Sequence, residues 1–138
     1  MDFHDEALRW LEEAEQDLQA VSGNIAAGSF NWACFIAQQA AEKAVKAMRI
    51  ERGEDVLRIH SVMALIRGDE RRGLPALATL HALLEDAQEL DQHYIPARYP
   101  NGVPFGRPHE FYNRRKAERC LECAQRIVSA CRSILSPT

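Results

Sequence analysis

The sequence predicts an all-α protein, an up-and-down bundle of four long helices and one short helix in a single domain over residues 1–138. Hydrophobic residues recur every three or four positions along four long stretches, and no strand pattern alternates with them. The composition, 46% hydrophobic and 27% charged, is that of a globular domain with one core. Disordered and collagen-like classes are thereby excluded.

The first helix is expected over residues 4–27, where a hydrophobic stripe lies opposite a side rich in acidic residues. The stripe consists of Leu8, Leu11, Leu18, Val21 and Ile25. Gly28 and Ser29 then interrupt the pattern, and Ser29 is of the type that caps a following helix.

The second helix is expected over residues 30–51 and is dense in alanine. The alanines are Ala33, Ala37, Ala40, Ala41, Ala44 and Ala47. Small side chains let a neighbouring helix approach closely, so this helix is predicted at the centre of the bundle or in a dimer seam. Glu42 and Lys46 are spaced to form a supporting ion pair along it.

Three more helices follow from the same periodicity. A two-turn helix is expected after His60 and Ser61, with Val62, Leu65 and Ile66 as its apolar side. A fourth helix is expected from about residue 75 to about residue 93, because leucines recur along it and proline is tolerated in a first turn. The last helix is expected from about residue 113 until the proline at position 137.

Between the last two helices, residues 94–112 contain four prolines and two glycines, which exclude a regular element. Long connections of this kind inside a small domain are usually functional or interfacial. We therefore expect this segment to carry binding residues.

The charge of the chain is unevenly distributed, although the net charge is only −3. Residues 1–20 hold seven acids and one base, whereas residues 107–138 hold seven bases and three acids. The two terminal helices are expected to attract each other, within the fold or across a dimer. Acids dilute the basic residues too evenly for a general DNA-binding protein.

The sequence contains none of the common nucleotide-binding, zinc-protease or hydrolase motifs. The five histidines are scattered, and the four cysteines include only one Cys-x-x-Cys pair, so we expect reduced, buried thiols and neither a metal nor a cofactor. No stretch is apolar enough to span a membrane, and the acidic start is unlike a signal peptide. A cytoplasmic location is therefore expected.

The candidate binding residues are Lys43, Lys46, His60, Arg98 and Tyr99. Arg98 lies between two tyrosines, so its planar guanidinium would meet a phosphate or carboxylate with aromatic faces beside it. Lys43 and Lys46 share nearly one side of the second helix and would add positive charge. The alternatives are that Arg98 and its tyrosines anchor a protein–protein interface or pin the loop, or that they are merely exposed.

These groups resemble the HEPN domain family, small helical bundles named for nucleotide binding in higher eukaryotes and prokaryotes. The resemblance runs in order over about 120 residues. It comprises Trp10 with Ala14-Glu15-x-Asp17-Leu18, the run from Trp32 to Ala47 containing Gln38-Gln39-Ala40-Ala41-Glu42-Lys43, the pair His60-Ser61, the motif Tyr94-Ile95-Pro96-x-Arg98-Tyr99-Pro100, and the alanine-spaced last helix.

The resemblance implies a bundle similar to the C-terminal domain of kanamycin nucleotidyltransferase, and a homodimer. Stand-alone prokaryotic members often accompany a minimal nucleotidyltransferase in a two-component system of toxin–antitoxin type. Many HEPN proteins are metal-independent ribonucleases that use an Arg-x4–6-His motif at a dimer cleft. There the histidine would act as general acid or base, and the arginine would stabilise the transition state.

This sequence departs from the family at that motif. Arg52 and His60 are separated by seven residues, and Arg98 and His109 by ten. The leading hypothesis is therefore a non-catalytic homodimer that binds a nucleotide or a nucleotidyltransferase partner through the five candidate residues. One alternative is a ribonuclease toxin in which His60 or His109 meets an arginine across the dimer, and RNA would be its substrate. Another is a purely structural dimerisation module.

Overall fold

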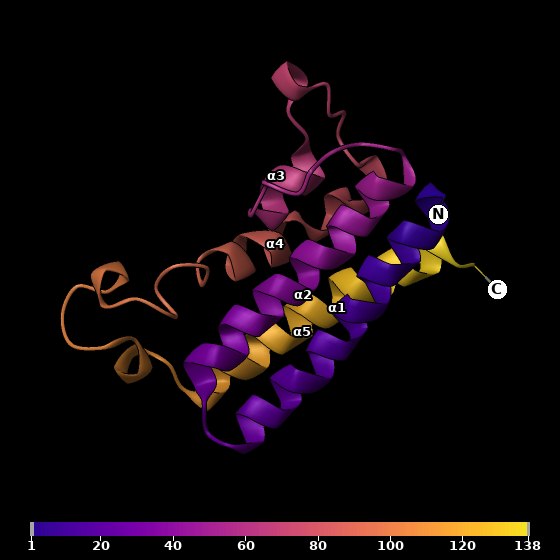
Figure 1. The fold of residues 1–138 in the computed structure, drawn as a ribbon. Helices are drawn as coiled ribbons and strands as arrows, with labels where there is room; N and C mark the ends of the chain where they lie inside the picture. Colours follow the sequence, from indigo (N-terminus) through magenta and orange to yellow (C-terminus); the bar gives the residue numbers. More distant parts are fainter. Residues whose placement is uncertain (1, 138) are drawn as a thin grey trace.

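The computed structural model describes residues 2–137, which form an all-α bundle without strands. Its α-helices are α1 (Phe3–Ala26), α2 (Phe30–Glu51), α3 (Val62–Arg67), α4 (Leu84–Asp91) and α5 (Arg114–Leu135). Four 3-10 turns join them, η1 (Glu70–Arg72), η2 (Ala78–Leu83), η3 (Pro100–Gly102) and η4 (Pro108–Phe111). The long helices α1, α2 and α5 lie side by side, and the short α3 and α4 pack beside α2 (Figure 1). The all-α bundle predicted from the sequence is confirmed.

The fourth helix differs from the expectation in length. Residues 78–83 form the 3-10 turn η2, and only the eight residues of α4 are α-helical. Leu77, Leu80 and Leu83 are spaced by three, a spacing that suits a 3-10 helix as well as an α-helix. The bundle therefore has three long helices and two short ones.

Side-chain caps begin most of the helices. Asp2 accepts a hydrogen bond from the Asp5 amide at the start of α1, and Asn113 accepts one from the Lys116 amide at the start of α5. Ser61 caps α3 through the Ala64 amide, at the place where the sequence predicted this helix to begin. Ser29 occupies the N-cap position of α2 as expected, but its side chain makes no capping hydrogen bond.

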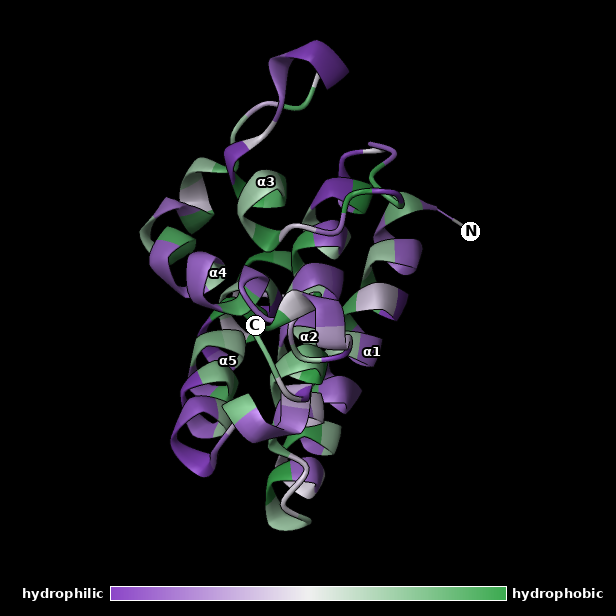
Figure 2. Cartoon of the chain, turned by 90° about the vertical axis from the view of Figure 1, so that its left-hand side faces the viewer, coloured by the Kyte–Doolittle hydropathy of each residue, from purple (hydrophilic) through white to green (hydrophobic). Residues whose placement is uncertain are grey.

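Helix α2 forms the centre of the core, as its alanines predicted. All six alanines are fully buried, and the helix packs against both α1 and α5. In Figure 2 much of the hydrophobic colouring lies between these helices, whereas the turn around Glu70–Arg72 that projects from the body is hydrophilic. Because α2 is covered on several sides, even its polar residues Gln38, Lys46 and Arg49 are buried.

The basic residues of α5 form ion pairs with two different helices. Arg132 pairs with Glu15 of α1, at 2.5 Å between Nη2 and Oε1, which is the attraction expected between the terminal helices. Arg119 and Arg126 instead pair with Glu89 and Asp86 of α4, each at 2.7 Å. Two of the six basic residues of α5 thus hold α4 against the bundle.

The four cysteines are buried free thiols, in agreement with the sequence-based expectation. Burial raises the pKa of the Cys131 thiol to about 12, which keeps it protonated and unreactive near neutral pH. Within residues 2–137, no helix combines the length and apolarity that a membrane span requires.

Candidate functional site

Arg98 is enclosed by three aromatic rings. Its guanidinium carbon lies 4.2 Å from the ring centre of Phe35, 4.7 Å from that of Tyr94 and 4.9 Å from that of Tyr99. Its Nε donates a hydrogen bond to the Tyr94 carbonyl oxygen at 2.8 Å. Within residues 2–137, no carboxylate pairs with Arg98, and its two Nη atoms make no hydrogen bond. Among the described residues, the hydrogen-bond donors of both Nη atoms are therefore unused.

The backbone before Arg98 is folded so that the side chain returns onto α2. The amides of Arg98 and Tyr99 both donate to the carbonyl oxygen of Ile95, which closes a tight turn after Pro96. Ala97 within this turn is fully buried, and its carbonyl oxygen accepts a hydrogen bond from Asn31 of α2 at 3.0 Å. These contacts hold the start of the proline-rich segment against α2.

His60 joins the same cluster through Tyr94. The two rings are stacked, with centres 5.6 Å apart and an interplanar angle of 13°. About half of the His60 side chain remains exposed, and its Nδ1 lies 3.4 Å from Oε2 of Glu42. The structure thus brings three of the five candidate residues together, His60, Arg98 and Tyr99, with Tyr94 between them.

A shallow hollow of about 400 Å³ lies beside this cluster, lined by His60, Ser61, Asp91, Tyr94, Ile95 and Pro96. Asp91 at its edge accepts hydrogen bonds from four groups, the Ser61 hydroxyl, the Gln38 amide and the backbone amides of Val62 and Met63. Its carboxylate is therefore occupied in holding the start of α3. What the hollow offers a ligand is therefore the apolar surface of Tyr94, Ile95 and Pro96 together with the exposed part of His60.

Lys46 lies inside the fold. Its side chain is almost fully buried, and its Nζ lies 2.9 Å from Oε2 of Glu42 and 3.1 Å from the Leu57 carbonyl oxygen. The Glu42–Lys46 pair predicted from the sequence is therefore present. Its charge is neutralised, so Lys46 supplies no free cation to the site.

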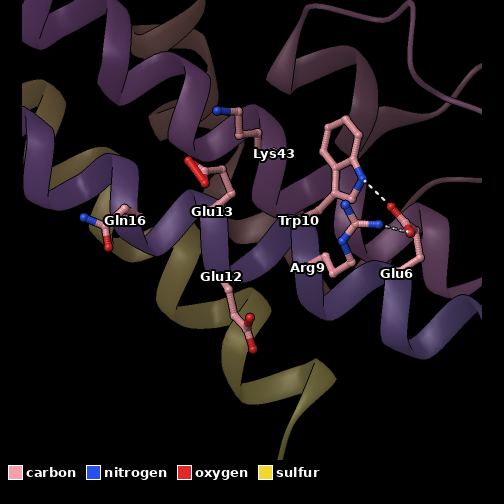
Figure 3. Close-up of a pocket in the computed structure, with 7 residues that line it drawn as sticks. All are labelled: Glu6, Arg9, Trp10, Glu12, Glu13, Gln16 and Lys43. Atoms are coloured by element: carbon pink, nitrogen blue, oxygen red, sulfur yellow. Dashed lines mark hydrogen bonds and ion pairs between the residues drawn. The ribbon is translucent and has the colours of Figure 1, made fainter. Parts of the chain in front are cut away.

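Lys43 lies apart from the cluster in a groove of about 690 Å³ along α1 (Figure 3). Its Nζ forms an ion pair with Asp17 at 2.7 Å. The groove is lined by three glutamates, Glu6, Glu12 and Glu13, and by Trp10, whose indole nitrogen donates to Glu6. This groove holds more acids than bases, so it is unsuited to a phosphate.

Sequence reasoning missed Phe35, which forms the face of the cluster nearest to Arg98. Neither Phe35 nor Trp32 is among the five candidate residues, yet Trp32 is 47% exposed and contacts Phe35 edge to face, with ring centres 5.9 Å apart. Their spacing of three along an otherwise alanine-rich helix is the signal that marks an aromatic surface there.

The cluster combines a planar cation with exposed rings. An arginine with free Nη donors binds a phosphate or carboxylate through two parallel hydrogen bonds. Rings such as those of His60 and Tyr99 provide faces on which a nucleobase stacks. The arrangement is suited to a ligand that has an anionic group next to a flat one.

Comparison with known proteins identifies the family. The HEPN domain model matches residues 7–134. The protein "Putative toxin MJ1304" of Methanocaldococcus jannaschii is 27% identical over 94% of this chain and 88% of its own length.

Solved structures agree with this assignment. TT1696 from Thermus thermophilus superposes with a TM-score of 0.79 at 38% identity, covering 92% of this chain and 96% of that one. The archaeal HEPN homologue ST0689 gives 0.74 at 34% identity, with coverages of 94% and 98%. An HEPN domain protein from Thermotoga maritima gives 0.67 at 32% identity, with coverages of 94% and 99%. The chain belongs to the HEPN domain family.

Proposed function

We propose that this HEPN protein is a non-catalytic, homodimeric nucleotide-binding module and one half of a toxin–antitoxin type system with a nucleotidyltransferase. The observation that carries the proposal is Arg98, a cation enclosed by aromatic rings with two Nη atoms that bond no group of residues 2–137. A buried or half-buried cation normally has a counter-charge, and a nucleotide phosphate would supply one.

Each residue of the cluster has a distinct role in this proposal. Arg98 binds the phosphate through its Nη donors, while Phe35 and Tyr94 hold the guanidinium in place. The exposed faces of His60 and Tyr99 stack on the base. Asp91 is saturated by the chain itself, so we expect little discrimination between bases.

The partner part of the proposal is supported by exposed apolar side chains around the cluster. Trp32, Ile95 and Tyr99 are between 41% and 49% exposed. Aromatic residues next to an arginine are typical of the energetic centres of protein interfaces. The relative whose name describes it as a toxin supports a toxin–antitoxin context.

A thermal-shift screen of the full chain with ATP, GTP and short RNAs tests the proposal. A ligand present at 100 times its Kd adds about 2.7 kcal/mol of stability and raises Tm. We expect a nucleotide to raise the Tm of the wild type and of Arg107→Gln, but not that of Arg98→Gln. Arg107 is the matched control because it is an exposed arginine of the same segment, paired with Glu110. A shift that persists in Arg98→Gln contradicts the proposed site.

One observation favours a second function, a metal-independent ribonuclease toxin. His60 and Arg98 lie against the same tyrosine, so the fold brings a histidine and an arginine together although the Arg-x4–6-His motif is absent. Incubation of the short RNAs with the protein in EDTA, followed by gel electrophoresis, tests this function. Cleavage that His60→Ala abolishes would establish it, and intact RNA would contradict it.

A further inference from the structure

His93 connects the two ends of the segment that carries the binding residues. It is 5% exposed, directly precedes Tyr94, and its Nδ1 lies 2.9 Å from the hydroxyl of Tyr112. The two rings also meet edge to face, with centres 5.4 Å apart. Tyr112 is itself buried and lies just before the Asn113 cap of α5. The contact between these two buried side chains therefore joins the two ends of residues 94–111, here called the site loop.

Part of the site loop lies outside the helical body. In Figure 1 it extends away from the long helices between α4 and α5. Its exposed residues include Phe105, which packs on Phe111 at the far end of the loop. Lys116 of α5 also holds the C-terminal end of the loop, because its Nζ donates a hydrogen bond to the Phe111 carbonyl oxygen.

The other neighbours of His93 hold its ring in one orientation. Its Nε2 lies 3.2 Å from Oε2 of Glu89 in α4, and the other oxygen of Glu89 accepts from Arg119 of α5 at 2.7 Å. Cys120 of α5 also contacts the ring, and Cys34 of α2 lies next to Cys120. When the neutral ring carries its proton on Nε2, it donates a hydrogen bond to Glu89 and accepts one from the Tyr112 hydroxyl. Elements α4 and α5 therefore fix the residue that precedes Tyr94.

We propose that His93, through its contact with Tyr112, is a positioning residue that sets the geometry of the Arg98 site. Tyr94 transmits the position, because its carbonyl oxygen accepts from Arg98 and its ring contacts both Arg98 and His60. Ligand affinity depends on how much of a site is ordered before binding. The effect on affinity rests on the proposed nucleotide function, whereas the effect on loop order does not.

The experiment compares Tyr112→Phe and His93→Gln with the wild type. Tyr112→Phe keeps the ring contact and removes only the hydroxyl, so it retains the fold even where His93→Gln is strongly destabilised. Ile127→Val is the control, because it trims a fully buried side chain of α5 that belongs to the core rather than to the loop. Hydrogen exchange of residues 94–99 and the Kd for ATP are measured on each protein at a temperature where all are folded.

We expect faster exchange in residues 94–99 of both loop variants and an ATP affinity about fivefold weaker, the effect of one neutral hydrogen bond. Ile127→Val should leave exchange in this segment and the Kd unchanged. Unchanged exchange in both loop variants overturns the proposal, and so does faster exchange with an unchanged Kd. If the wild type binds no ATP, the nucleotide function fails, and exchange alone decides whether His93 orders the loop.

Discussion

Lys46 and Arg98 differ in which groups of the fold offset their positive charge. Lys46 is almost fully buried and pairs with Glu42, whose carboxylate also contacts His60. His60 stacks on Tyr94, and Tyr94 in turn contacts Arg98, which pairs with no carboxylate of residues 2–137. Both cations are partly or fully withdrawn from water. The difference indicates that Lys46 stabilises the fold, whereas Arg98 is available to a ligand.

The largest expected effect is a loss of stability when the carboxylate that pairs with Lys46 is removed. Glu42→Gln leaves Lys46 buried without a counter-charge, which should lower the free energy of unfolding by about 3 kcal/mol. Urea unfolding measures the loss. Glu13→Gln, an exposed glutamate of α1, is the control and should change stability by no more than about 0.5 kcal/mol. A loss below about 1 kcal/mol for Glu42→Gln would show that Lys46 does not depend on its partner.

A smaller effect is expected when a ring that contacts Arg98 is removed, and it concerns ligand affinity rather than stability. Phe35→Leu removes the ring nearest to the guanidinium, and the lost cation–π contact should weaken ATP binding by about 1 kcal/mol, or about fivefold. Isothermal titration calorimetry measures the change. Phe30→Leu is the matched control, because Phe30 of the same helix contacts Arg114 instead. Equal losses in the two variants would contradict a specific role for Phe35.

The contribution of the buried His93 to stability can be recognised by its pH dependence. Burial lowers the pKa of His93, but hydrogen bonds to Cys120 and Glu89 raise it, and the net shift is upward from 6.5. A histidine whose pKa is higher in the folded than in the unfolded protein stabilises the fold. This stabilisation is fully present at a pH below the unfolded-state pKa and is lost as the pH rises through the folded-state pKa.

The stability difference between the wild type and His93→Gln should therefore shrink as pH rises from below 6.5 to well above it. Urea unfolding across this range measures it. His4 has a pKa shifted in the same direction by Glu51, and its contribution cancels because both proteins retain it. A difference that grows with pH would contradict the account.

The smallest effect is expected for Lys43, which the sequence suggested as a binding residue. Its partner Asp17 lies on α1, and both side chains are partly exposed, so Lys43→Gln should cost about 0.5 kcal/mol of stability. The Kd for ATP should change by less than about twofold, since the residue lies outside the cluster. A tenfold loss of ATP affinity would instead place Lys43 in the site.

Much of the fold could be predicted from the sequence because helical periodicity and alanine density are local signals. The α2 alanines and the Glu42–Lys46 pair are both found as expected. The start of α4 could not be predicted, because leucines spaced by three satisfy a 3-10 turn as well as an α-helix.

The arrangement of the candidate residues could be predicted only in part, because each position depends on contacts that form only in the folded chain. His60, Arg98 and Tyr99 come together because the turn at Ile95 folds back onto α2, a contact between distant segments that no local pattern encodes. The spacing of Glu42 and Lys46 predicted their ion pair, but only the contact of Lys46 with the Leu57 carbonyl oxygen and its packing in the fold show that it is buried. Phe35 was missed because an aromatic residue on a helix is usually part of the core.

The central claim is that Arg98 binds the phosphate of a nucleotide, and a double-mutant cycle tests it most directly. Calorimetric titrations of wild type and Arg98→Gln with ATP and with adenosine separate the phosphate from the base. Loss of charge-assisted hydrogen bonds should weaken ATP binding by about 2 kcal/mol, or about 30-fold, and leave the affinity for adenosine unchanged. Equal affinities of the two proteins for ATP, or equal losses for ATP and adenosine, would contradict the claim.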